Sequence, residues 1–186
     1  SQSEIQKYKD KRLKGSESGL VALYHMNEGP YVASQTLIDS VGGKNATCYG
    51  SVQWTKRNGY QAPDIRAASM ALSFDGVDDY GVATGTKLPS GTSPLTVMFW
   101  TFDRVDKTAM VPVSWGDNDA KACIPYITDR FGLSLSGPYF MLADSRKSFA
   151  SWRHVAYVLP ENGTLGSFSV FLDGQLCTGA RSYYNG

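Results

Sequence analysis

The sequence predicts an all-β domain, built as two antiparallel sheets packed in a sandwich, with a short helix at the N-terminus. Short segments in which apolar and polar side chains alternate recur along the chain, with glycine, asparagine or aspartate between most of them. Hydrophobic residues make up 42% and aromatic residues 12% of the 186 positions, which is enough for a sizeable core. A β-sandwich of this length fits a single domain.

The N-terminal helix is expected over residues 1–13, because Ile5, Tyr8 and Leu13 lie near one face at helical spacing. Ser1 or Ser3 can cap it, and Glu4 stands where a capping box after Ser1 requires a glutamate. The basic residues of the chain cluster only here, which indicates a solvated helix face.

The central strands are expected in residues 70–82. Leu72 and Phe74 alternate with Ser73, Asp75-Gly76 is a hairpin signal, and Val77 begins a second apolar stretch through Tyr80 and Val82. The other strands are expected at residues 19–29, 52–54, 95–102, 110–114, 126–135, 139–142, 152–158 and 168–176. The residues expected to be mostly buried on these strands are Leu72, Phe74, Val97, Phe99, Val155, Tyr157, Val170 and Leu172.

The string from Leu72 to Tyr80, Leu-Ser-Phe-Asp-Gly-Val-Asp-Asp-Tyr, resembles the hairpin of laminin-G-like, concanavalin-A-like lectin-glucanase domains. Residues 37–47, with an Asp-Ser start, paired glycines and an Asn-Ala exit, are similar to the family's second segment. Residues 152–155 (Trp-x-His-Val) and the Asp173-Gly174 hairpin add two further motifs. The resemblance covers about residues 19–176 and implies a jelly-roll β-sandwich.

The resemblance also implies a division of the chain. Residues 1–15 resemble the helical tail that follows the last strand of such a domain, so they are expected to be either a tail or linker from a preceding repeat or a helix that packs on this domain. Residues 16–186 are expected to form the jelly-roll domain without its final strands, because no Asp-Glu-Val-Arg-like string follows Cys177. An open sheet edge would then pair with another segment or a second copy.

Composition limits the possible functions and locations. The net charge of +1 argues against nucleic-acid binding, which usually needs a strongly basic face. The sequence has no apolar run of the roughly 20 residues that span a bilayer, and its first 19 residues are polar, unlike a signal peptide. We therefore expect a piece of a longer secreted or cell-surface protein, without membrane insertion.

Cysteines and glycosylation patterns leave alternatives open. Cys48, Cys123 and Cys177 are too few and too scattered for a disulfide framework or a zinc site. One disulfide with a spare thiol and three buried free thiols are both compatible with the sequence. Residues 45–47 and 162–164 match the glycosylation acceptor pattern, which is also frequent by chance.

Catalysis is not expected, although the same sandwich hosts glucanases. Retaining glycoside hydrolysis needs two carboxyl groups about 5 Å apart. The four glutamates are far apart in sequence, and His25 and His154 have no serine or cysteine nucleophile in a recognisable elbow beside them. His154 is expected to be structural. We predict no catalytic residues, and a glucanase-like hydrolase is the least favoured of three functions.

A structural calcium ion is the expected cofactor, if any. Calcium takes oxygen ligands from carboxylates and carbonyls held in loops. Asp39 beside Gly42-Gly43 is one candidate ligand, Asp75 and Asp78 in the central hairpin are two more, and residues 117–119 form a third loop. The simpler interpretation is that these are turn aspartates, held by local bonds to the backbone.

The preferred function is a non-catalytic, lectin-like recognition module that binds carbohydrate. An exposed aromatic ring can stack on a sugar while nearby polar side chains bond its hydroxyl groups. Trp115 with Asp117, Asn118 and Asp119 offers these groups on one loop and is the predicted ligand site. The alternative is a structural or adhesive repeat that contacts an extracellular protein.

Overall fold

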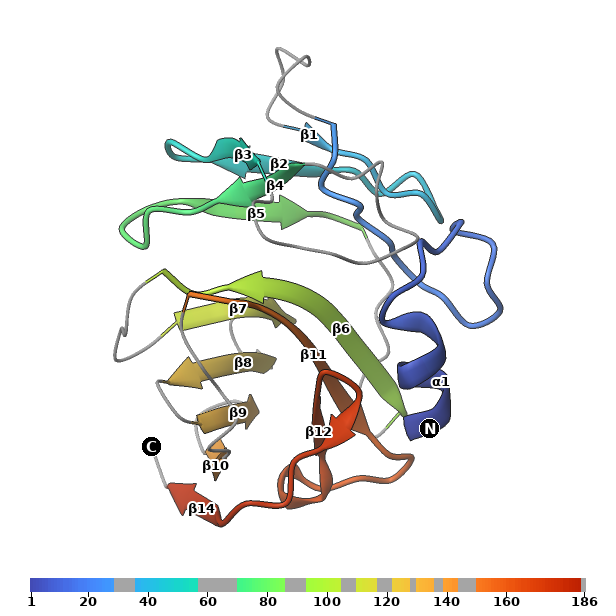
Figure 1. Cartoon of the computed structure of the whole chain (residues 1–186), viewed down its shortest axis with the longest axis vertical. Coiled ribbons are helices and arrows are strands. Elements are labelled where there is room, and N and C mark those ends of the chain that lie inside the picture. The colour runs from blue at the N-terminus through green and yellow to red at the C-terminus, as the bar shows by residue number, and fades with distance from the viewer. Residues whose placement is uncertain are drawn as a thin grey trace. The chain divides into compact units, whose positions relative to one another are not determined.

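The computed structural model describes residues 1–28, 36–56, 70–85, 93–104, 110–116, 122–127, 130–135, 139–143 and 150–184 (Figure 1). The side chains of residues 56, 110, 122–127, 135, 139, 165 and 184 lie outside this description. The described part is mostly antiparallel β-sheet with one short α-helix, which confirms the all-β class. None of its helices has the length and apolar character needed to cross a membrane.

The chain divides into two compact units, which are described separately. Unit 1 comprises residues 1–9 and 89–186, and unit 2 comprises residues 10–88.

Unit 1 contains a five-stranded and a four-stranded antiparallel sheet (Figure 1). The five-stranded sheet has the order β14-β10-β9-β8-β7, with β7 at Met110–Trp115, β8 at Ala122–Ile127, β9 at Arg130–Leu135, β10 at Tyr139–Ala143 and β14 at Arg181–Tyr184. The four-stranded sheet has the order β13-β12-β11-β6, with β6 at Leu95–Phe102, β11 at Trp152–Leu159, β12 at Ser169–Leu172 and β13 at Gln175–Leu176.

These two sheets share one apolar core. Phe131 lies opposite Leu142 across β9 and β10, and both are buried. On the other sheet, Tyr157 of β11 lies between Val97 of β6 and Val170 of β12. Because side chains alternate along a strand, these residues share one face of each sheet. The predicted strand phases of β6, β11 and β12 are therefore confirmed.

The helix α1, Gln2–Tyr8, packs on the outer face of the four-stranded sheet. Ile5 is buried there against side chains that alternate with the inward-facing ones, namely Met98, Ala156, Val158 and Phe171. The Nε2 groups of Gln2 and Gln6 donate to the carbonyl oxygen of Gly174, and Trp100 Nε1 donates to the carbonyl oxygen of Lys9 at 3.1 Å. The helix is thus part of the packing of unit 1.

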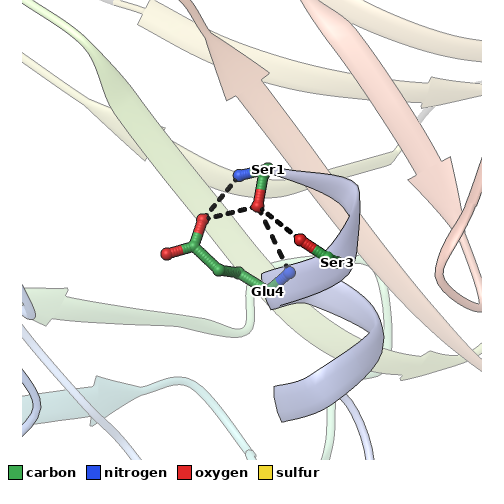
Figure 2. A network of polar contacts seen from close by, with 3 residues as sticks. All are labelled: Ser1, Ser3 and Glu4. Carbon is green, nitrogen blue, oxygen red and sulfur yellow. Dashed lines mark hydrogen bonds and ion pairs between the residues drawn. The ribbon is translucent and has the colours of Figure 1, made fainter.

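The capping box predicted at the helix N-terminus is present (Figure 2). Ser1 Oγ accepts from the backbone N–H of Glu4 at 3.4 Å, and Glu4 Oε2 accepts from the Ser1 amino group at 2.7 Å. Ser1 Oγ also contacts Ser3 Oγ at 2.9 Å (Figure 2). The helix ends at Tyr8, however, five residues before the predicted end at Leu13.

Unit 2 consists of shorter strands. One sheet has the order β1-β2-β5, with β1 at Thr36–Leu37, β2 at Ala46–Tyr49 and β5 at Tyr80–Ala83. A second sheet pairs β3, Gln53–Lys56, with β4, Met70–Ser73. Their small core is formed by Leu37, Ala46, Cys48 and Val52, with Tyr24, Met26, Trp54 and Leu72 packed against it.

The structure corrects the central hairpin. The strands β4 and β5 do not pair with each other: β4 pairs with β3, and β5 pairs with β2. Gly76 does take the predicted positive φ, of 77°, but it lies in a loop between two sheets. Phe74 follows the last residue of β4 and is 46% exposed, so its predicted burial is wrong.

Other strand predictions also change. Residues 19–28 form no strand and contribute only an isolated bridge between Tyr24 and Asp39. The segment predicted as one strand at 126–135 belongs to two strands, β8 and β9. The strand β14, which follows the last predicted hairpin, was not foreseen, and it pairs with β10.

Candidate functional site

Two stacked tyrosine rings lie exposed on the surface of unit 2. Tyr49 on β2 lies directly opposite Tyr80 on β5, with ring centroids 5.1 Å apart and ring planes 18° from parallel. The two residues remain 46% and 53% exposed. Stacked aromatic side chains that stay this open to solvent offer a rigid contact surface at little cost in conformational entropy.

The register of the sheet explains why both tyrosines point outward. Ala46 and Cys48 of β2 are buried in the core of unit 2, so Thr47 and Tyr49, which alternate with them, occupy the opposite face. Val82 lies opposite Thr47 and is 39% exposed. The outer face of β1-β2-β5 thus combines two phenol rings with β-branched side chains.

The loop from Phe74 to Asp79 leads directly into this face. Asp75, Asp78 and Asp79 place carboxylate oxygens within 4.8 Å of one another. Asp75 Oδ1 accepts from the Val77 backbone N–H at 2.8 Å, the local bond that favours aspartate in turns. Val77, at the tip, is 84% exposed.

Asp79 connects this loop to the turn between β2 and β3. Its Oδ2 accepts from the backbone N–H of Asp75 at 2.8 Å, and its Oδ1 accepts from the backbone N–H of Ser51. Gly50, at φ +82°, makes this approach possible, because a Cβ there would lie 2.5 Å from Asp79 Oδ1. Asp79 therefore has a structural role in addition to its place in the carboxylate cluster.

Two of the three predicted calcium ligands, Asp75 and Asp78, lie together with Asp79, which was not among the predicted ligands. Three carboxylates supply the oxygen donors that calcium prefers. Exposed acidic clusters are also common without a metal, so the calcium assignment stays a prediction.

Asp39, the third predicted ligand, is the buried centre of its own turn. Its Oδ1 accepts from the backbone N–H groups of Leu23 and Val41, and its Oδ2 accepts from those of Gly42 and Lys44. Burial would raise the pKa of Asp39, but these four donors outweigh it and hold the pKa below its ordinary value. The bonds occupy both carboxylate oxygens, which favours a structural role for Asp39.

The predicted sugar-binding loop is described only at its beginning. Trp115 ends β7, is half-buried and packs against the core of unit 1. Asp117, Asn118 and Asp119 lie outside the described residues. The indole of Trp115 therefore contributes to the core, and its participation in ligand binding stays a prediction.

Three of the four glutamates take part in local backbone contacts. Glu4 belongs to the capping box, Glu17 accepts from the backbone N–H groups of Lys14 and Gly15, and Glu28 Oε1 accepts from the Ile38 N–H at 3.1 Å. Glu161 is exposed in the turn after β11.

The two histidines lie in different units. Burial and the nearby positive charge of Arg12 lower the pKa of His25, so its neutral form prevails at pH 7. His154 is buried on β11, where its ring contacts Trp100 edge-on at 5.3 Å. Its backbone N–H donates to Asp173 Oδ1 and its carbonyl oxygen accepts from the Asp173 N–H. This environment fits the structural role predicted for His154.

Cys48 is a buried thiol in the core of unit 2. Burial raises its pKa, and the negative charges of Glu28 and Asp79 raise it further, so the thiol form is favoured and reactivity is low. Cys177 is buried in the core of unit 1, and the side chain of Cys123 is not among those described. Buried thiols were one of the two alternatives left open by the sequence.

Tyr49 was not among the residues predicted to be functional, and Tyr80 was expected only as part of the apolar stretch that begins at Val77. The alternation Ala-Thr-Cys-Tyr in residues 46–49 could have indicated that Tyr49 lies on the polar face of its strand.

Comparison of the chain with protein-family models, curated proteins and solved structures finds no match.

Proposed function

We propose that this chain is a non-catalytic recognition module of a secreted or cell-surface protein, with a jelly-roll sandwich fold of the laminin-G-like type, and that it binds carbohydrate. The observation that carries the proposal is the exposed, stacked pair of Tyr49 and Tyr80, together with the carboxylates of Asp75 and Asp78 in the loop that leads into β5. Aromatic rings pack on the apolar C–H faces of sugars, while carboxylates accept hydrogen bonds from their hydroxyl groups.

The test is glycan-array binding of the whole chain and of Tyr80→Ala. We expect signal for particular glycans and its loss in Tyr80→Ala, with the midpoint of thermal unfolding nearly unchanged because Tyr80 lies on an exposed face. Tyr183→Ala is the control, since Tyr183 in unit 1 is 52% exposed and its ring lies beside that of Phe140, with centroids 4.9 Å apart and the planes inclined by 50°. Equal loss in both variants, or glycan binding that persists in Tyr80→Ala, would refute the tyrosine site.

The predicted loop of Trp115 to Asp119 is a second possible contact for the same ligand. Asp117→Ala and Asp119→Ala test it better than Trp115→Ala, because Trp115 packs on the core and its loss would weaken folding. Reduced glycan binding in the aspartate variants, with unchanged unfolding, would support this loop.

The alternative function is a structural or adhesive repeat that contacts protein. The apolar side chains of Phe74, Val77 and Val82 favour it, because all three are exposed in the same unit. Strand addition is a further route to a protein partner, since β6 pairs only with β11 within the described residues. Binding to no glycan, together with concentration-dependent self-association in sedimentation velocity, would favour this function. Turnover of a β-glucan by the pure protein would support the hydrolase instead.

A further inference from the structure

The loop between β11 and β12 carries an acceptor pattern for N-linked glycosylation, Asn162-Gly163-Thr164. The loop lies on the surface of unit 1, and both Asn162 and Thr164 are exposed. A three-residue pattern is weak evidence alone, because turns favour asparagine and glycine for reasons of backbone geometry. The structure allows the contributions of these three residues to be separated.

Backbone geometry explains why asparagine and glycine occur at positions 162 and 163. Asn162 has a φ of 55°, in the left-handed region that asparagine tolerates better than most residues. The Gly163 N–H donates to the carbonyl oxygen of Pro160 at 3.0 Å. A Cβ at Gly163 would lie 2.8 Å from that oxygen and 2.8 Å from Ser167 Oγ, so glycine is required.

Backbone geometry does not explain why position 164 is a threonine. It is the N-cap of the 3₁₀ helix η1, Leu165–Ser167, but its side chain makes no capping hydrogen bond. The backbone carbonyl oxygen of Thr164, and not its side chain, accepts the hydrogen bonds here: one from the Ser167 N–H at 2.9 Å and one from Ser167 Oγ at 2.7 Å. An exposed threonine hydroxyl two residues after an exposed asparagine is the arrangement that the glycosylation pattern requires.

The second match to the pattern, residues 45–47, provides an internal comparison. Asn45 Oδ1 accepts from the backbone N–H of Asp39 at 3.1 Å, which holds the side chain against its own turn. Ala46 and Thr47 lie in β2, paired with β1 on one side and β5 on the other. A transferase would have to separate these strands to bind that segment, whereas the segment at 162–164 lies in a surface turn.

We propose that Asn162 is a site of N-linked glycosylation and that Asn45 is a poor acceptor in the folded chain. The side-chain nitrogen of Asn162 would attack C1 of the first sugar of an oligosaccharide carried on a lipid diphosphate. The bond between C1 and the diphosphate oxygen breaks, the lipid diphosphate leaves, and a base of the transferase takes one amide proton. This proposal rests on the secretory location in the proposed function but not on the carbohydrate ligand.

The test is expression of the whole chain behind a secretion leader in a eukaryotic cell, which supplies the transferase and the lipid-linked donor. Site occupancy is measured by peptide mass spectrometry in both the secreted and the retained fractions. We expect Asn162 to be occupied, occupancy to be lost in Thr164→Ala and kept in Thr164→Ser, and Asn45→Gln to leave glycosylation unchanged. Thr164→Ala is the decisive variant, because it keeps Asn162 and Gly163 of the turn.

An unmodified Asn162 in both fractions, or a glycan on Asn45 alone, would overturn the proposal. Neither result bears on ligand binding, which the glycan array measures separately. Conversely, if no glycan on the array binds, glycosylation of Asn162 would still support the proposal made here.

Discussion

The two units of the chain are stabilised in different ways. In unit 1, strands of up to eight residues enclose a core in which Phe131, Leu133, Val155, Tyr157 and Val170 are fully buried. In unit 2 the strands have two to four residues, and the buried core cluster contains only small and medium-sized side chains. Apolar burial therefore contributes far more in unit 1.

Unit 2 compensates with carboxylates that bind loop backbones. Asp39 accepts four backbone N–H donors, Asp79 accepts two, and Glu17 accepts two. Hydrogen bonds donated to a charged acceptor are about twice as strong as those between neutral groups. Short strands leave many backbone groups outside the sheet ladders, and these carboxylates satisfy part of them. Within the described residues, carboxylates thus hold several turns of the unit that has the smaller buried core.

The largest effect is expected from truncating the core of unit 1. Phe131→Ala should lower the free energy of unfolding by about 3–5 kcal/mol, because a fully buried ring leaves a cavity. Phe74→Ala in unit 2 should cost less than about 1 kcal/mol, since Phe74 is already half-exposed. Urea denaturation of both variants measures the difference. Equal losses would contradict the comparison of the two units.

The next largest effect is expected at the polar centre of unit 2. Asp39→Ala should cost roughly 3 kcal/mol, because it deprives four backbone N–H groups of their charged acceptor. Asp75→Ala is the matched control and should cost less than about 1 kcal/mol, since Asp75 is exposed and accepts one local bond. Comparable losses of unfolding free energy in Asp39→Ala and Asp75→Ala would show that burial of the carboxylate does not increase its contribution to stability.

The contribution of Asp39 should depend on pH with a defined sign. Its pKa in the folded chain lies below the ordinary value of 3.8, so the folded state binds a proton less readily than the unfolded state. The stabilisation is therefore complete above the ordinary pKa and is lost as the pH falls through the folded pKa. Unfolding free energies measured from pH 7 to pH 2 should show this loss, and Asp39→Asn should weaken it. An unchanged pH profile in Asp39→Asn would exclude Asp39 as its source.

A smaller effect is expected from glycines with positive φ. Gly19→Ala should cost about 1 kcal/mol, because Gly19 has a φ of +79° but its Cβ would meet no atom within 4 Å. Gly50→Ala should cost more, because its Cβ would also crowd Asp79 Oδ1 and the Asp78 carbonyl oxygen. Thermal unfolding of the two variants separates backbone strain from crowding. Equal shifts of the unfolding midpoint in the two variants would mean that the loop containing Asp79 can move away from the added Cβ at no measurable cost in stability.

The smallest effect is expected from calcium. At a calcium concentration about five times the dissociation constant, binding to the native state alone adds roughly 1 kcal/mol. The midpoint of thermal unfolding should then fall when a chelator is added, and Asp78→Asn should abolish this response while Asp39→Asn should not. A midpoint that does not respond to chelator in the unaltered chain would remove calcium as a structural element.

Much of the local structure could be predicted from residues that are close together in the chain. Alternation of side chains located β6 and β11 to within one residue, because a half-buried strand must place its apolar residues on one face. Ser1 and Glu4 identified the helix start, since the capping box depends only on residues three apart. At the Asp173-Gly174 turn, both residues have the positive φ of a type I′ hairpin, as the dipeptide predicts.

Strand pairing and the exposure of each sheet face could not be predicted in this way. The Asp75-Gly76 dipeptide allows a hairpin, but β4 and β5 pair with strands outside it. The candidate site could not be predicted for the same reason. Tyr49 and Tyr80 are far apart in sequence, and their rings meet only because β2 and β5 are neighbours in one sheet. Likewise, both Asp39 and Asp75 are turn aspartates in sequence, and only the backbone donors gathered around Asp39 distinguish a buried structural carboxylate from an exposed one. Pairing and burial depend on residues distant in the chain, which local sequence patterns do not encode.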